Sequence, residues 1–182
     1  MNEIKNSRKN IEKLVLAALF LALGMILPLL TAQIKEIGDT LLPMHLPVML
    51  CAFICGLKYG ASVGLILPFF RSFVFGMPPI YPNAVWMALE LATYGLVIGL
   101  MCLSKHKSKP AWIYLSLVTA QISGRIVWGI AKAVLLGTQG KAFTFGMFWV
   151  GGFADALPGI ILQIVLIPLI IIVLNKVLKR EI

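Results

Sequence analysis

Charged residues are scarce in this 182-residue chain: they make up 13% of it, while 60% of the residues are hydrophobic. A soluble domain of this length has about 25% charged residues, so the composition excludes an ordinary soluble fold and indicates an integral membrane protein. A span needs about 20 apolar residues, which leaves room for six helices with short loops. A second, soluble domain does not fit.

Motifs for catalysis and for nucleotide or metal binding are missing as well. The chain has no P-loop, no HExxH helix and no nucleophile with a paired base, so we expect no enzymatic activity and no cofactor. The 3 cysteines are accompanied by only 2 histidines, which lie far apart in sequence, so the thiols are expected to be buried and inert. The net charge of +9 comes without a continuous basic surface carrying base-stacking aromatics, so no nucleic-acid partner is expected.

Six apolar segments are predicted to be the helices of a single integral membrane domain, residues 1–182. They cover residues 14–31, 47–56, 61–75, 83–103, 111–136 and 151–174. We expect residues 1–13 to form a short amphipathic or frayed lead-in, and Pro68 to interrupt the third helix. Residues 32–46 and 137–150 are predicted to be outer loops. The first of these is long enough to cover a site, although it could also be a plain connector.

The loop charges predict the orientation. Eleven Lys and Arg residues lie in the lead-in, the turn between the second and third predicted helices, the loop between the fourth and fifth, and the C-terminal tail. The connections on the other side hold two, Lys35 and Lys141. By the positive-inside rule both termini are then cytoplasmic, which requires an even number of spans. The predicted fold is an all-α, multi-pass membrane protein with six transmembrane helices and both termini in the cytoplasm.

The segment 121–132 carries two cations inside a span. Gln121, Arg125, Trp128 and Lys132 recur at helical spacing and therefore share one face. Each cation near the bilayer centre costs about 2.5–3.5 kcal/mol on insertion scales, so such residues usually line a site or face a partner. A second stripe of the same kind lies on the 83–103 helix and consists of Asn83, Met87, Glu90 and Tyr94.

Five charged residues fall in the outer half of the predicted bundle: Arg71, Glu90, Arg125, Lys132 and Asp155. One positive charge is left over, and a solute carboxylate would balance it, with the planar fork of Arg125 suited to bind it. The other candidates supply amides, aromatic walls and a histidine: Asn83, Gln121, Gln163, Trp86, Trp128, Tyr94, Tyr81, Trp149 and His45. This concentration at one end indicates capture of a solute from outside.

Structural alternatives remain open for the same residues. Glu90 with Arg125, and Asp155 with Lys132, could be ion pairs that lock helices together. Lys132 could instead extend to the membrane interface, and Arg71 could anchor the outer boundary. Aromatic residues near helix ends also form membrane-interface belts.

Ala18 and Ala22 form a small-x-x-x-small pair in the first helix, which on spacing alone indicates packing within the chain. This pair is one of several features that the chain shares with one family. The others are six short helices, both ends inside, the long first loop and the segments HLPVMLCAFICGLKYG and RSFVFGMPPIYPNAVWMALELATYG. Nearly the whole chain resembles the substrate-binding subunits of energy-coupling factor (ECF) transporters, the vitamin importers of bacteria.

This resemblance implies a subunit of the bacterial cell membrane that binds one vitamin or precursor near its outer face, under the loop after the first helix. The subunit then topples on a transmembrane coupling protein that is driven by two cytoplasmic ATPase subunits. Ala18 and Ala22 match the coupling-protein contact of the family. The spare positive charge favours a carboxylate such as pantothenate. Pyridoxine or a hydroxymethylpyrimidine would use the aromatics and amides, with the charges paired among themselves.

Two other classes of function are open. A stand-alone secondary transporter or channel predicts polar residues along the inner half of the bundle. A scaffold without a ligand predicts that the outer polar groups all pair with one another.

Overall fold

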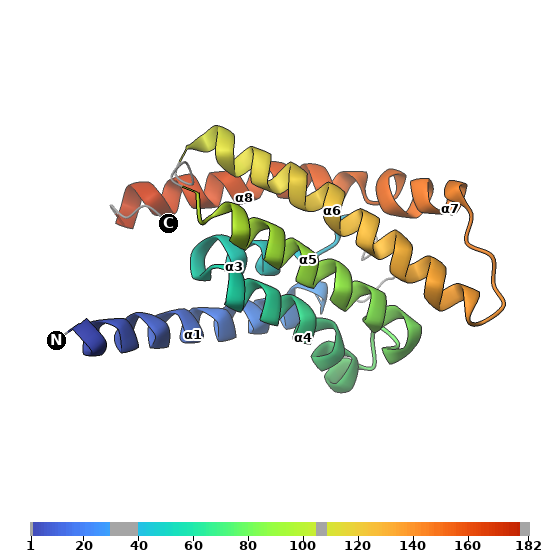
Figure 1. Cartoon of the computed structure of the whole chain (residues 1–182), viewed down its shortest axis with the longest axis horizontal. Coiled ribbons are helices and arrows are strands. Elements are labelled where there is room, and N and C mark those ends of the chain that lie inside the picture. Colours follow the sequence, from blue (N-terminus) through green and yellow to red (C-terminus); the bar gives the residue numbers. More distant parts are fainter. Residues whose placement is uncertain (1, 30–39, 105–108, 179–182) are drawn as a thin grey trace.

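The computed structural model describes residues 2–29, 40–104 and 109–178, and every regular element in them is a helix (Figure 1). The helices are α1 (Asn2–Ile26), α3 (His45–Cys55), α4 (Leu57–Phe75), α5 (Val85–Met101), α6 (Pro110–Gly137), α7 (Phe145–Trp149) and α8 (Leu157–Leu178). A 3-10 turn, η1 (Leu27–Leu29), and two π-helical turns, η2 (Ile80–Ala84) and η3 (Val150–Ala154), extend them. The predicted all-α class is confirmed, and each of the six predicted segments is largely helical.

Four helical segments in the described part are long and apolar enough to cross a membrane: Asn6–Leu29, Ile80–Met101, Pro110–Gly137 and Leu157–Lys176. The 11 residues of α3 extend only about 16 Å, well short of the bilayer's apolar core of about 30 Å. Most of α3 is buried inside the bundle instead. Four spans are therefore supported, and the full set of six stays a prediction.

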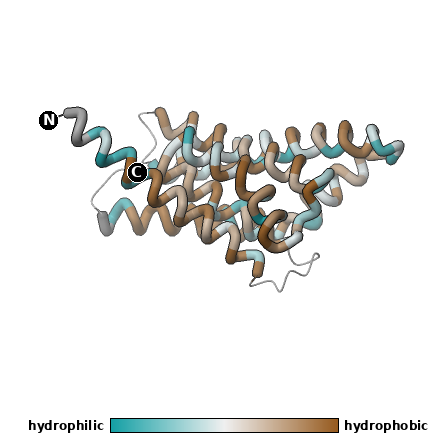
Figure 2. Tube along the Cα trace, turned by 90° about the horizontal axis from the view of Figure 1, so that it is seen from below, coloured by the Kyte–Doolittle hydropathy of each residue, from teal (hydrophilic) through white to brown (hydrophobic). Residues whose placement is uncertain are grey.

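The helices run alternately in opposite directions along the bundle. Figure 1 shows the start of α1, the end of α8, the end of α5 and the start of α6 on one side, while the α4–α5 and α6–α7 connections lie at the far side. This placement agrees with the predicted even number of passes. Figure 2 shows hydrophobic residues along most of the helical length and hydrophilic residues at the start of α1. Which side faces the cytoplasm stays a prediction.

Several predicted boundaries are wrong. The lead-in is helical from residue 2, and Arg8 and Glu12, which lie 3.6 Å apart at i,i+4 spacing, support that first stretch of α1. Pro68 does not interrupt α4, which continues to Phe75. The expected 137–150 loop contains α7, whose first turn is capped by Thr144 Oγ1 accepting from Met147 N at 3.3 Å.

Two further differences affect the loop and the last helix. The last predicted helix is divided into η3 and α8 around residues 155 and 156. His45, expected in the 32–46 loop, is the first residue of α3. Residues 32–39 of that loop lie outside the described residues, so its role as a cover stays a prediction.

Glycines bring α4 and α5 into close backbone contact. Gly60 and Gly64 on α4, and Gly95 and Gly99 on α5, are each spaced four residues apart. A Cβ on Gly64 would collide with the Leu91 carbonyl, and a Cβ on Gly95 would collide with the Gly60 backbone. Small residues at this spacing allow membrane helices to approach closely. This interface is the most extensive between any two helices described, and it fixes the helix that carries Glu90.

α6 has two distinct faces. One bears an exposed row of apolar residues at four-residue spacing: Val118, Ile122, Ile126, Ile130 and Val134. The opposite face bears Gln121, Arg125 and Trp128, which are 6%, 2% and 7% exposed. The predicted polar stripe is therefore confirmed as one inward face, while the apolar row is available to lipid.

We predict that Gly95→Ala destabilises the protein by about 1–3 kcal/mol, because the added methyl group has to displace the α4 backbone. Gly137→Ala is the matched control, since a Cβ there meets no atom within 4 Å. Thermal unfolding of both variants in detergent measures the difference. Equal melting temperatures for the two variants would contradict the close-contact role of Gly95.

Candidate functional site

A buried carboxylate, Glu90, lies where α3, α5 and α6 meet. Its Oε1 accepts a hydrogen bond of 2.7 Å from the Tyr94 hydroxyl and lies 3.0 Å from Arg125 Nη1. His45 Nε2 lies 3.4 Å from the same oxygen, without hydrogen-bond geometry. Glu90, Arg125 and His45 are each 2% exposed, and Tyr94 is fully buried. Because a lone buried charge is unfavourable, this grouping compensates both Glu90 and Arg125.

The local sequence explains why these side chains meet. Glu90 and Tyr94 are four residues apart on α5 and so project from the same face. Gly124 on α6 makes room for the Tyr94 ring, since a Cβ at position 124 would collide with it. The His45 ring packs against Tyr94 with a centroid separation of 5.4 Å. The two polar stripes indicated by the sequence therefore face each other at Glu90 and Arg125.

Arg125 keeps hydrogen-bonding capacity beyond its pair with Glu90. Only Nη1 contacts the carboxylate, while Nε and Nη2 have no hydrogen-bond partner among the described residues. These two nitrogens form one edge of the planar guanidinium, the edge that binds carboxylates in a bidentate manner. Buried donors are nearly always satisfied in folded proteins, so this edge marks a place where a ligand can bind.

An amide pair joins α6 to α8 beside the arginine. Gln121 Nε2 donates to Gln163 Oε1 at 2.6 Å, and Gln163 is only 1% exposed. The sequence indicated Gln163 as a possible amide contact but not its pairing with Gln121. Spacing on one helix cannot show which residue of another helix faces it, so this pair required the structure.

Aromatic rings cover the polar centre on one side. Arg125 Cζ lies 6.0 Å from the Trp128 ring centroid, and Lys132 Nζ lies 4.5 Å from it. The same ammonium lies 5.4 Å from the Trp86 ring and 5.6 Å from the Phe143 ring. Lys132 is half-buried against these rings, as cation–π attraction favours. Phe143, which lies in the connection between α6 and α7, was not among the predicted site residues.

Five of the predicted site residues are not brought into this centre. Arg71 is buried, but its Nη1 donates to the Met25 carbonyl at 2.8 Å and so ties α4 to the last turn of α1. A cation there stabilises the end of a helix, which is a structural role. Asp155 is exposed where η3 meets α8, and Asn83 is half-buried in η2, two turns before Glu90. The other predicted aromatics, Tyr81 and Trp149, are exposed.

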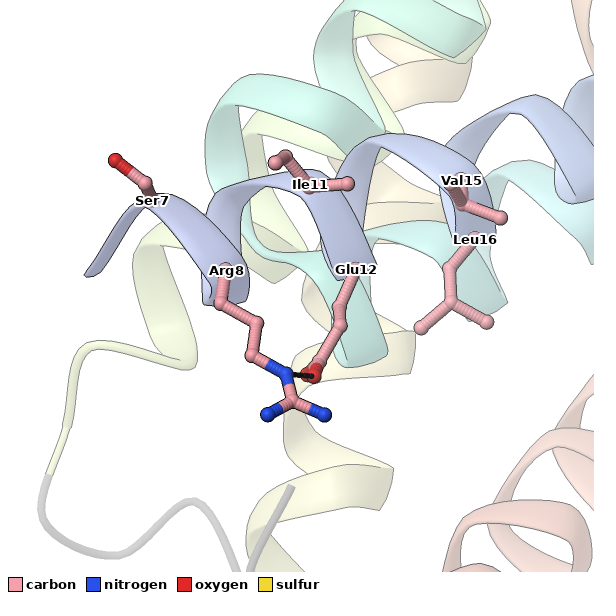
Figure 3. Close-up of a pocket in the computed structure, with 6 residues that line it drawn as sticks. All are labelled: Ser7, Arg8, Ile11, Glu12, Val15 and Leu16. Atoms are coloured by element: carbon pink, nitrogen blue, oxygen red, sulfur yellow. Dashed lines mark ion pairs between the residues drawn. The ribbon is translucent and has the colours of Figure 1, made fainter. Parts of the chain in front are cut away.

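The groove drawn in Figure 3 lies away from this centre, on the exposed surface of α1. It is lined by Ser7, Arg8, Ile11, Glu12, Val15 and Leu16 and holds the Arg8–Glu12 ion pair, both of whose side chains are at least half exposed. It contains no buried polar group and is open to its surroundings. Further along the same helix Ala18 and Ala22 are exposed, whereas Ala17 is buried. Neither Ala18 nor Ala22 is therefore buried against the chain's own helices.

No group of three or more His, Cys, Asp and Glu side chains in the described ranges could hold a metal ion. What the described helices bring together is a buried ion pair with unpartnered donors, one amide pair and an aromatic wall, an arrangement typical of candidate solute sites in membrane transport proteins.

The comparisons with known proteins agree with this class. A model of the family "ECF transporter, substrate-specific component" matches residues 12–171, so the chain belongs to the substrate-specific components of ECF transporters. The resemblance seen in the sequence is thereby confirmed. Searches among curated proteins and solved structures give no match.

We predict that Glu90→Gln lowers stability by about 3–5 kcal/mol, because it leaves the Arg125 charge buried without compensation. The double variant Glu90→Gln/Arg125→Met should recover part of the loss, since neither charge then remains. Glu12→Gln, which breaks the exposed pair with Arg8, is the control and should have little effect. Unfolding in detergent distinguishes these cases. Unchanged stability of the Glu90→Gln variant would show that the buried pair is not a stabilising contact.

Proposed function

We propose that this subunit captures a water-soluble vitamin or vitamin precursor at the Arg125–Glu90 centre and delivers it to an ATP-driven ECF importer in the bacterial cell membrane. The observation that carries the proposal is the Nε–Nη2 edge of Arg125, which has no hydrogen-bond partner among the residues that the structure describes. A buried arginine that uses one nitrogen on its own protein and keeps its bidentate edge unpaired is suited to bind a solute. ATP hydrolysis would occur in separate partner subunits.

The first candidate ligand is a carboxylate such as pantothenate. Its two oxygens match the fork of Arg125, and Trp128 supplies an apolar wall beside it. His45, Gln121 and Gln163 have further unpartnered polar atoms that could satisfy its hydroxyls and amide. Lys132 remains part of the proposed site because its ammonium packs on the same Trp128 ring.

The Glu90–Arg125 contact supports a second candidate. Because the carboxylate already compensates the guanidinium charge, a neutral ring such as pyridoxine or a hydroxymethylpyrimidine could bind through Arg125 as a hydrogen-bond donor alone. Such a ring would stack on Trp128. The two candidates differ in whether they require the bidentate edge.

Transport by this chain alone is less well supported. A relay or channel needs polar side chains along its path, but the buried polar groups of the described helices lie mostly away from the end that carries the termini. Ser116 is the exception on α6, and its hydroxyl donates to the Trp112 carbonyl of its own helix at 2.7 Å. A partner assembly is therefore the better-supported route.

The exposed pair Ala18 and Ala22 on α1 is proposed as the contact with the transmembrane coupling subunit. Both are small, so another helix could approach the α1 backbone closely there. Neighbouring apolar side chains on α1, Leu14, Val15 and Leu19, are also exposed and would add buried area. Two cytoplasmic ATPase subunits would complete the assembly.

Thermal stabilisation of the purified protein by pantothenate, pyridoxine and a hydroxymethylpyrimidine tests the capture function. We predict that Arg125→Lys weakens carboxylate binding by about 10–100-fold, because lysine keeps a charge near Glu90 but lacks the bidentate fork. Arg125→Ala should abolish that binding. Binding of the neutral rings should change less in Arg125→Lys.

Stabilisation by no vitamin would reject the capture function. Retained carboxylate affinity in both Arg125 variants would assign this residue to the pair with Glu90 alone.

We predict that Ala18→Trp leaves vitamin binding intact but blocks uptake into cells, because the indole prevents close approach of the coupling helix. Leu162→Trp is the control, since Leu162 is also exposed and apolar but lies on α8. Uptake of radiolabelled vitamin, measured beside binding to the same purified variants, separates the two steps. Normal uptake by Ala18→Trp would exclude the docking role.

A further inference from the structure

The amide pair lies one helical turn from the guanidinium. Gln121 precedes Arg125 by four residues on α6, so the two side chains leave the same face about 6 Å apart along the axis. Gln121 is 6% exposed and Gln163 is 1% exposed. Water therefore has little access to either amide from the surface.

The hydrogen bond between the two amides engages one side-chain nitrogen and one side-chain oxygen of the four polar atoms in the pair. After Gln121 Nε2 donates to Gln163 Oε1, the Gln121 oxygen and the Gln163 nitrogen have no partner among the described residues. The oxygen can only accept and the nitrogen can only donate. A solute amide carries the complement, because its N–H donates and its carbonyl accepts.

The numbers of unpartnered donors and acceptors in the site also constrain which ligand can satisfy them. Three unpartnered nitrogens can only donate, namely Arg125 Nε, Arg125 Nη2 and Gln163 Nε2, while the Gln121 oxygen is the matching acceptor. A ligand that satisfies this set needs more acceptors than donors. A carboxylate plus an amide provides three acceptor oxygens and one N–H.

We propose that Gln121 and Gln163 recognise an amide of the solute while the Nε–Nη2 edge of Arg125 binds its carboxylate. The inference rests on the proposed function and narrows it to one substrate class, acids that carry an amide within about 6 Å of the carboxylate. Pantothenate, in which a short methylene link joins the two groups, serves as the probe. The amide pair thus sets specificity, and Arg125 holds the charge.

The sharpest test compares pantothenate with its ester analogue, in which an oxygen replaces the amide N–H and every other group is kept. Calorimetric titration of the full chain in detergent should show about tenfold tighter binding of the amide, because only its N–H can donate to Gln121. Gln121→Leu should bind the two ligands equally. Gln163→Leu should weaken both about tenfold, since both keep the carbonyl that Gln163 would contact.

Ser116→Ala is the control on the same helix, because Ser116 is buried but bonds only within α6, and it should retain the tenfold preference. If Gln121→Leu does not fold, Gln121→Met has a similar length and replaces it. Equal binding of amide and ester by the unmodified protein would overturn the inference, as would an undiminished preference in the Gln121 variant.

The outcomes also separate the inference from the function beneath it. Binding of pyridoxine without binding of pantothenate overturns the inference and leaves vitamin capture standing. Binding of no vitamin at all overturns both.

Discussion

The compensation of one buried carboxylate organises the structure around Glu90. An ionised side chain inside an apolar bundle is tolerated only when opposite charge and hydrogen bonds surround it. Arg125 supplies the charge, Tyr94 donates a hydrogen bond, and His45 lies close by. These partners come from α3, α5 and α6, so the position of a single oxygen atom constrains three helices at once.

The same constraint creates the site. Glu90 engages one nitrogen of Arg125 and thereby holds the guanidinium in place, while no described residue pairs with its Nε–Nη2 edge. The close glycine contact between α4 and α5 fixes the position of the helix that carries Glu90. Gly124 leaves space on α6 for the ring of Tyr94, whose hydroxyl donates to Glu90. In the proposed role of Arg125, the guanidinium is oriented before any solute arrives, which would reduce the entropy lost on binding.

Sequence patterns predicted what depends on one helix at a time. The inward stripe of α6 and its counterpart on α5 follow from helical spacing and from the cost of buried charge, which left the Glu90–Arg125 pair as one of two open interpretations. Contacts between distant segments did not follow. Arg71 binds a carbonyl of α1, Gln121 meets Gln163, and Asp155 is exposed, because each depends on how helices rotate about their axes. The sequence left the lead-in open as amphipathic or frayed, because its polar residues carry no clear apolar periodicity, and the structure makes it the start of α1.

The state of the Arg125 side chain during binding tests the account most directly. The chain has four arginines, so selective ¹⁵N-arginine labelling gives a simple spectrum, in which Arg125→Lys identifies the Arg125 signal. We predict that saturation with the vitamin that stabilises the protein shifts the Arg125 Nε–H resonance and slows its exchange with water, while the signal of exposed Arg8 stays unchanged. Saturating binding that leaves the Arg125 resonance unmoved would contradict the central claim that this guanidinium edge holds the solute.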